Sequence, residues 1–246
     1  MSSVAYLEAA AAGLARLRET QVEAIDRGAK MMADAIASGH KILAFGATHS
    51  FIVPMEMVYR TGGLMLVNVI YPHGMDLSVR PMTLTSQLER VAGLGRALLE
   101  NSPARPGDVL IIASVSGRNH VAIDMAIAAR EAGVATIAIT SMEYTQSVVS
   151  RHPSGKKLYE LCDHVIDNCA PAGDAAVEIP GLAQKTGPLS SVLGCAVANA
   201  MVAQAIRDLM DRGVKPPVFV SANLPGGDEH NAKLLAANRD RIFYLD

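Results

Sequence analysis

Two short polar loops carry the residue types that could hold a substrate. One runs Ser114-Val-Ser-Gly-Arg-Asn119 and the other runs Ala47-Thr-His-Ser50. Each follows an apolar run typical of a parallel strand covered on both faces, and each precedes a helical pattern. At such a junction, free backbone N–H groups and the positive end of a helix dipole favour an anion. The loop at 114–119 is therefore predicted to be an anion site.

Small hydroxyl side chains at strand-to-helix junctions also act as ordinary helix caps. For either loop taken alone, capping is as good an interpretation as ligand binding. Two such loops in one series of strands and helices favour a shared ligand. Arg118 fits two interpretations, because it can pair with the anion or stand exposed at the start of a helix.

The elements that must position these loops form an alternating series. Apolar runs predict strands at 41–46, 64–70, 109–113, 134–139 and 164–168, and helical patterns are expected at 3–37, 51–60, 84–99 and up to residue 132. Right-handed crossovers place helices on both faces of the sheet and a pocket outside the carboxyl ends of its strands. The predicted fold class is α/β, a three-layer αβα sandwich with a five-stranded parallel sheet in flavodoxin-like order.

We predict one domain, residues 1–246, with an N-terminal helical region (1–38), a core (39–213) and a C-terminal helical tail (214–246). Within it, the stretch Cys169–Lys185 is expected to be an extended loop or hairpin.

The last two helices have specific start signals. Thr186-Gly-Pro188 is expected to begin a helix that continues to Asp211. Asp228 is expected to cap a final helix that ends at Arg239.

The composition indicates which types of binding partner and which cellular compartment to expect. Lys and Arg number 22 against 24 Asp and Glu, so no basic field favours nucleic acid as a partner. Residues 187–206 carry no charge, but their small and polar side chains favour a close-packed buried helix over a membrane span. Charged residues within the first 20 positions argue against a signal peptide, and the odd number of cysteines, 3, fits a reducing cytoplasm.

Cys162, His164 and Cys169 lie close together in the sequence, but their spacing matches no ordinary zinc pattern. Val165 and Ile166 between them are typical strand residues. We expect structural packing at this point, and we predict neither a metal nor a cofactor.

The chain resembles the sugar isomerase (SIS) domain family over roughly residues 35–212. The segments that carry the resemblance are Lys41–Ser50, Asp108–Gly117 and Ala132–Thr140. Asn119 stands where the family often has Thr. The resemblance implies a phosphorylated sugar bound on a five-stranded parallel sheet, in a stand-alone subgroup of phosphosugar isomerase-like proteins.

The resemblance further implies which groups hold the phosphate, namely Thr48, Ser50, Ser114, Ser116 and Asn119. Hydroxyl and N–H groups can surround a dianion without a full countercharge, and Gly117 is expected to let the backbone approach it closely. A homodimer or homotetramer with sites near subunit interfaces is also expected.

Aldose–ketose isomerisation requires a base that moves a proton between adjacent carbons and an acid that opens the sugar ring. Glu178, beside uncharged residues, is the first candidate for the base, although an exposed loop carboxylate is an equal interpretation. Glu56 lies in the helix after the first loop, too far for the phosphate but within range of the sugar or of a neighbouring subunit.

Three histidines are candidates for ring opening. His49 lies inside the first loop, and His73 follows the end of a strand. His230 stands near the start of the last helix, from which it would reach a neighbouring subunit.

The primary hypothesis is a cytoplasmic phosphosugar isomerase that works through a cis-enediol. A second is a non-catalytic sensor of a sugar phosphate, because the same fold serves as the ligand-binding half of transcription regulators. A third is a lyase or deaminase acting on an amino-sugar phosphate. The phosphate loops alone do not separate these three.

Overall fold

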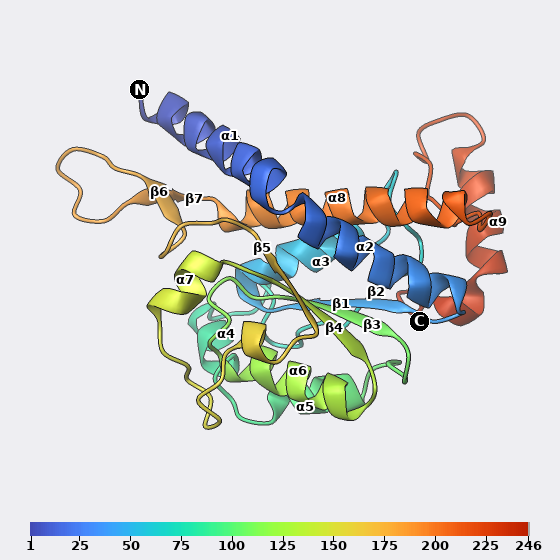
Figure 1. The fold of residues 1–246 in the computed structure, drawn as a ribbon, viewed down its shortest axis with the longest axis horizontal. Helices are drawn as coiled ribbons and strands as arrows, with labels where there is room; N and C mark the ends of the chain where they lie inside the picture. The colour runs from blue at the N-terminus through green and yellow to red at the C-terminus, as the bar shows by residue number, and fades with distance from the viewer. Residues whose placement is uncertain (246) are drawn as a thin grey trace.

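A computed structural model of the chain describes residues 1–245. Its centre is a parallel sheet of five strands in the order β2-β1-β3-β4-β5 (Figure 1). The strands are β1 (Ile42–Gly46), β2 (Val67–Val69), β3 (Val109–Ala113), β4 (Ala135–Thr140) and β5 (His164–Asp167). The predicted fold class is confirmed, including the flavodoxin-like strand order.

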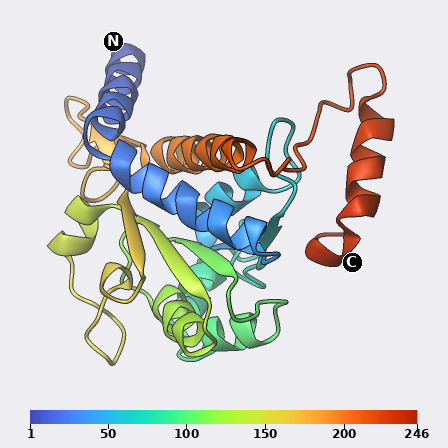
Figure 2. The same cartoon turned by 45° about the vertical axis from the view of Figure 1, so that its right-hand side comes forward.

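Alternate residues of the buried strands feed two separate cores, because successive side chains of a strand point to opposite faces of the sheet. Ile42 and Ala44 belong to the core under α2 (Val22–Ala37) and α8 (Ser190–Asp211). Leu43 and Phe45 belong to the core on the other face. That second core lies under α5 (Leu94–Glu100) and α6 (His120–Glu131), with α4 (Thr83–Leu88) nearby. Helices therefore cover both faces of the sheet (Figures 1 and 2).

Several short elements complete the layers. They are η1 (Thr48–Phe51), α3 (Ile52–Met57), α7 (Met142–Ser147), η2 (Leu158–Glu160), α9 (Gly227–Ala237) and η3 (Arg239–Arg241). Asn68 of the edge strand β2 donates to the Arg241 carbonyl oxygen at 3.0 Å and accepts from the Phe243 N–H at 2.8 Å. The C-terminal tail is thus tied to the open edge of the sheet.

Two elements project from this body on the same side (Figure 1). They are the helix α1 (Ser2–Thr20) and the antiparallel hairpin of β6 (Ala175–Val177) and β7 (Thr186–Pro188). The Tyr6 hydroxyl near the outer end of α1 donates to the Pro188 carbonyl oxygen of β7 at 3.0 Å, which joins the two projections.

Three of the predicted elements differ from the structure. Thr186–Pro188 does not start a helix, because it pairs as β7 with Gly187 at a φ of +74°, and α8 begins at Ser190. The expected helix at 84–99 is divided into α4 and α5 by Gly93, whose φ is +81°. Asp228 lies in the first turn of α9, whose N-cap is Gly226.

The helix α8 is the one described helix long and apolar enough, by length and composition, to cross a membrane. Its inner face is buried against the sheet and α2 through Leu193, Val197, Ala198 and Met201, all at 0% exposure. This inner face is packed as expected for a buried core helix.

Gly95 is the tightest point of the contact between α5 and α6. A Cβ at this position would overlap the Val121 carbonyl oxygen and lie 2.8 Å from the Met125 nitrogen, both of which are helix backbone. We predict that Gly95→Ala lowers the free energy of unfolding by about 1–3 kcal/mol or more, measured by urea denaturation.

The matched control is Gly13→Ala in α1, where the added Cβ would meet only the flexible end of Leu193. Since alanine also favours a helix by about 1 kcal/mol relative to glycine, this control should be neutral or stabilising. Equal losses in the two variants would contradict the predicted backbone overlap.

Candidate functional site

The strand order reverses between β1 and β3, whose carboxyl ends lie side by side. In open α/β sheets, ligands bind outside the strands at such a point. A cavity of about 170 Å³ lies there. Among its lining residues are Thr48, His49, Ser50, Glu89, Ser114, Ser116, Asn119, Tyr144, Asp174 and Ser190.

The first loop turns sharply over the end of β1. Thr48 has a φ of +53°, and its N–H donates to the Met75 carbonyl oxygen at 2.7 Å. Gly46 allows the turn, because a Cβ there would overlap the Ser50 carbonyl oxygen. The side chains of Thr48, His49 and Ser50 are all brought to the cavity in this way.

The second loop is held from the side opposite to the cavity. Gly117 is buried with a φ of +56°, and its carbonyl oxygen accepts from the Leu158 N–H at 2.9 Å. A Cβ there would lie 3.2 Å from the Thr145 hydroxyl and 3.3 Å from the Leu158 Cβ. Gly117 therefore serves close packing behind the loop and does not line the cavity, unlike Ser114, Ser116 and Asn119.

The hydroxyl groups of these loops are not helix caps. The N-caps of η1 and α6 make no side-chain capping hydrogen bond. Within residues 1–245, the hydroxyls of Thr48, Ser50, Ser114 and Ser116 have no hydrogen-bond partner among the protein side chains or carbonyl groups. Four hydroxyls around one cavity are thus free to bind a ligand.

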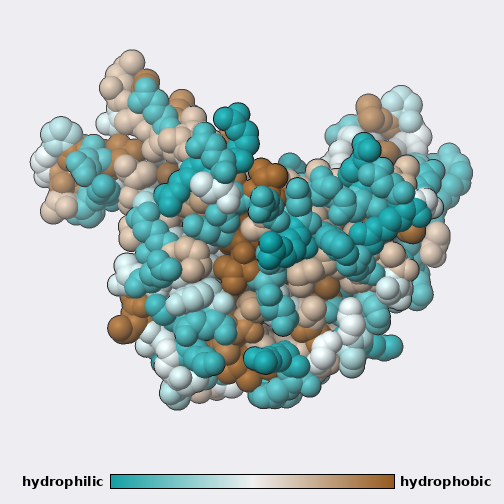
Figure 3. Space-filling view, viewed as in Figure 1, coloured by the Kyte–Doolittle hydropathy of each residue, from teal (hydrophilic) through white to brown (hydrophobic). Residues whose placement is uncertain are grey.

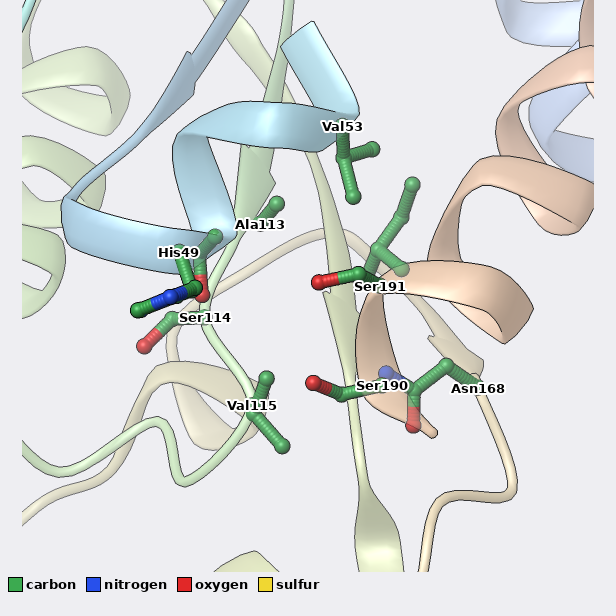
Figure 4. Close-up of a pocket in the computed structure, with 10 residues that line it drawn as sticks. His49, Val53, Ala113, Ser114, Val115, Asn168, Ser190 and Ser191 are labelled. Atoms are coloured by element: carbon green, nitrogen blue, oxygen red, sulfur yellow. The ribbon is translucent and has the colours of Figure 1, made fainter. Parts of the chain in front are cut away.

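A third wall comes from the start of α8, which the sequence patterns did not indicate. Ser190 and Ser191 face His49 and Ser114 across a narrow part of the site (Figure 4). Asp174 caps this helix end from a distant segment. Its Oδ1 accepts from the Leu189 and Ser190 N–H groups at 3.0 and 2.7 Å, and its Oδ2 accepts from the Ser190 hydroxyl at 2.7 Å.

Glu89 is a second residue of the cavity that sequence reasoning missed. It follows the short helix α4, where no pattern distinguished it from other surface carboxylates. Its Oε2 accepts from Asn119 Nδ2 at 2.5 Å. Asn119 Oδ1 in turn accepts from Arg151 Nη1 at 2.9 Å.

Of the predicted catalytic residues, only His49 lines the central cavity of this chain. Glu56 accepts from Asn199 at 3.0 Å and pairs with Arg60 at 3.0 Å. It borders a shallow apolar groove that also includes Thr48. His73 lines a separate cavity beside the C-terminal residues Phe243 and Tyr244.

Glu178 and His230 lie on the outer parts of the molecule. The Glu178 side chain is 79% exposed beside β6, where it pairs with Lys185 at 3.1 Å. His230 is exposed on α9, at the opposite end of the molecule from the hairpin (Figure 1). Neither lines the cavity of its own chain.

The cysteine and histidine side chains near β5 have separate structural contacts. The His164 ring nitrogen Nε2 is 2.7 Å from the Ala24 carbonyl oxygen of α2. Burial raises the pKa of the Cys162 thiol to about 12, and burial also raises the pKa of Cys169. Within residues 1–245, no group of three or more His, Cys, Asp and Glu side chains is arranged to hold a metal.

Together, the fold and the cavity define a parallel α/β protein with a hydroxyl-lined pocket at the switch point of its sheet. A family model described as SIS domain matches residues 5–141. A UPF0309 protein from Shouchella clausii is 43% identical over 246 residues, which are 98% of this chain and 100% of that protein. The chain therefore belongs to the SIS domain family and is a relative of the UPF0309 proteins.

Solved structures share the fold at low sequence identity. A phosphoheptose isomerase from Francisella tularensis is 14% identical, with a TM-score of 0.56 over 84% of this chain and 100% of that one. The sugar isomerase domain of an RpiR transcription factor from Sphaerobacter thermophilus is 18% identical, with a TM-score of 0.50 over 97% of this chain and 98% of that one. At these identities the likeness concerns the fold.

Asp174 should contribute to stability through the start of α8. We predict that Asp174→Ala lowers the free energy of unfolding by about 1–2 kcal/mol, because the Ser190 N–H and hydroxyl lose their acceptor and the Leu189 N–H keeps only the carbonyl oxygen of residue 174. The control is Asp228→Ala, which removes a first-turn carboxylate of α9 and should cost about 0.5 kcal/mol. Urea denaturation measures both, and equal losses would contradict the capping role.

Proposed function

We propose that this protein binds a sugar phosphate at the switch point of its sheet and interconverts its aldose and ketose forms. The observation that carries the proposal is the set of free hydroxyls on Thr48, Ser50, Ser114 and Ser116 around one cavity. These groups come from two loops at adjacent strand ends, and their hydroxyl protons can be donated to the oxygens of an anion. Asn119 adds a polar side chain to the same wall.

The family and fold support the substrate class. The first of the compared structures is a phosphoheptose isomerase, and its fold covers most of this chain. In the proposed reaction, the phosphate is held between the loops and the sugar carbons extend toward the rest of the cavity. His49 borders the cavity from the first loop, and we assign it to proton transfer at the ring oxygen during ring opening.

We also propose that the protein is a homodimer or homotetramer. Large apolar side chains are exposed on the projecting elements and on the adjoining part of α8, among them Val4 (41%), Leu7 (66%), Leu182 (44%) and Val192 (41%). Brown apolar atoms are visible on both projections in Figure 3. A second copy of the chain would cover these side chains and bring Glu178, which lies on the same hairpin, toward its neighbour's cavity.

The double variant Leu7→Glu/Leu182→Glu tests this association. Burying two carboxylates in an apolar contact is unfavourable, so the variant should sediment at a lower mass than the wild-type protein in analytical ultracentrifugation. The control is Leu224→Glu, an exposed position (59%) near α9 and away from the projections. A monomeric wild-type protein, or an unchanged mass in the double variant, would refute the proposed contact.

Ligand binding and catalysis can be tested with one panel. Hexose, pentose, heptose and amino-sugar phosphates are screened for a rise in Tm, and stabilising ligands are then incubated in deuterated water. Deuterium exchange at the carbon next to the carbonyl, together with ketose formation, is the expected result. No stabilisation by any sugar phosphate would refute the proposal.

The loop hydroxyls should account for the binding. Hydrogen bonds to charged groups contribute about 1.5–3 kcal/mol each. Ser116→Ala and Thr48→Val should therefore each raise the Kd for the sugar phosphate about 10- to 100-fold. Ser86→Ala, an exposed serine of α4, serves as the control and should bind as the wild-type protein does.

The second candidate function is a sensor that binds the sugar phosphate without converting it. The fold of the sugar isomerase domain of a transcription factor extends over nearly the whole chain, which favours this alternative. Stabilisation without exchange or product would support the sensor. Release of ammonia or of an acid from an amino-sugar phosphate would instead support a deaminase or lyase.

A further inference from the structure

We infer that Glu89 is the carboxylate that transfers the proton between the two sugar carbons, and that Asn119 and Arg151 hold it in position. This inference rests on the proposed isomerase function and deepens it. It replaces a base delivered by a neighbouring copy with one that each chain carries in its own cavity.

Within residues 1–245, two carboxylates line the central cavity, Glu89 and Asp174. Both oxygens of Asp174 already accept hydrogen bonds from the start of α8. These bonds commit both carboxylate oxygens of Asp174 to holding the start of the helix. Glu89 accepts through Oε2 alone among the described interactions, so its second oxygen is available to a substrate.

The position of Glu89 is fixed at two points by the start of α6. Its carbonyl oxygen accepts from the Val121 N–H at 3.2 Å, and its Oε2 accepts from Asn119 Nδ2 at 2.5 Å. Farther along the same segment, the Gly93 N–H donates to Asp124 Oδ2 at 2.7 Å. The carboxylate is thus held beside Asn119 of the second loop, in the wall of the cavity.

Arg151 orients the Asn119 side chain by binding its amide oxygen. Its Nη1 donates to Asn119 Oδ1 at 2.9 Å, which directs the Asn119 amide nitrogen toward Glu89. Burial, followed by repulsion from Arg118 and Arg90, lowers the pKa of Arg151, while Glu89 acts in the opposite sense. Arg151 therefore places a cation close to the Glu89 carboxylate.

The proposed step is balanced without any further reactant. The Glu89 carboxylate removes the proton from C2 of the open-chain aldose. The electron pair of the broken C–H bond forms the C1–C2 double bond, the pi pair of the C1 carbonyl moves to O1, and O1 takes a proton from water to give the cis-enediol. The carboxylic acid so formed returns its proton to C1, and the O2 hydroxyl gives its proton back to water as the C2 carbonyl forms, so that the protons balance. Because the same carboxyl group removes and returns the proton, part of the transferred hydrogen should exchange with solvent.

The test measures deuterium uptake by the sugar phosphate that stabilises the wild-type protein. Glu89→Gln should reduce exchange about 100- to 10,000-fold, as expected for loss of a general base, while the rise in Tm with the ligand is retained. Glu89→Asp should recover part of the rate. Glu229→Gln, an exposed glutamate of α9 paired with Lys233, is the control.

Arg151 needs a readout that a purely structural role would not alter. In Arg151→Gln the carboxylate loses a nearby cation, so the acidic limb of the pH profile of kcat/KM should move to higher pH. Arg151→Lys retains the charge and should move the limb back. A lower rate with an unmoved acidic limb in Arg151→Gln would refute the positioning role.

The outcomes separate this inference from the function on which it rests. If the wild-type protein exchanges and the rate of Glu89→Gln stays within threefold of the wild-type rate, the role of Glu89 is overturned and the isomerase remains in place. Loss of exchange in Glu178→Gln, with Glu89→Gln active, would assign the base to a neighbouring copy. Binding without any exchange by the wild-type protein would overturn both the isomerase and the role of Glu89.

Discussion

The parallel pairing of β1 with β3 is the contact on which the site depends. The two strands are aligned from Ile42 opposite Val109 to Gly46 opposite Ala113, although 67 residues separate the paired positions. Because both strands run in the same direction, the polar loops that follow them emerge side by side. The reversal of strand order at this pair leaves the space between the loops open, since the following connections depart to opposite faces of the sheet.

The loops are held by the segments behind them, which leaves their side chains available in front. The backbone of the second loop bonds to the connection that follows α7, through Arg118 and Gly117. The first loop bonds to the connection after β2 through Thr48. With backbone groups satisfied in this manner, the hydroxyls on the cavity side are not needed for folding. This division of roles suits the anion site that we propose, in which neutral groups hold the ligand.

The remaining walls of the cavity come from separate segments of the chain. Asp174 fixes the start of α8 and so presents Ser190 to the cavity, whereas Glu89 is fixed by the start of α6. Helix ends with unsatisfied N–H groups attract carboxylates, and both acidic residues occupy such positions. They differ in how many donors they accept, which is why we assign one to structure and the other to chemistry.

Sequence periodicity alone determined the strands, their parallel arrangement and the two polar loops, because buried parallel strands are continuous apolar runs bounded by polar turns. It misplaced the start of α8, since Gly187 and Pro188 suit a hairpin as well as a helix start. It also selected Glu178 for its apolar neighbours, whereas that side chain is 79% exposed in its own chain. Glu89 and Ser190 enter the cavity only through long-range contacts with α6 and Asp174, and no local pattern reports such contacts. Local sequence patterns thus predicted the two polar loops, while tertiary packing decided which carboxylate stands beside them.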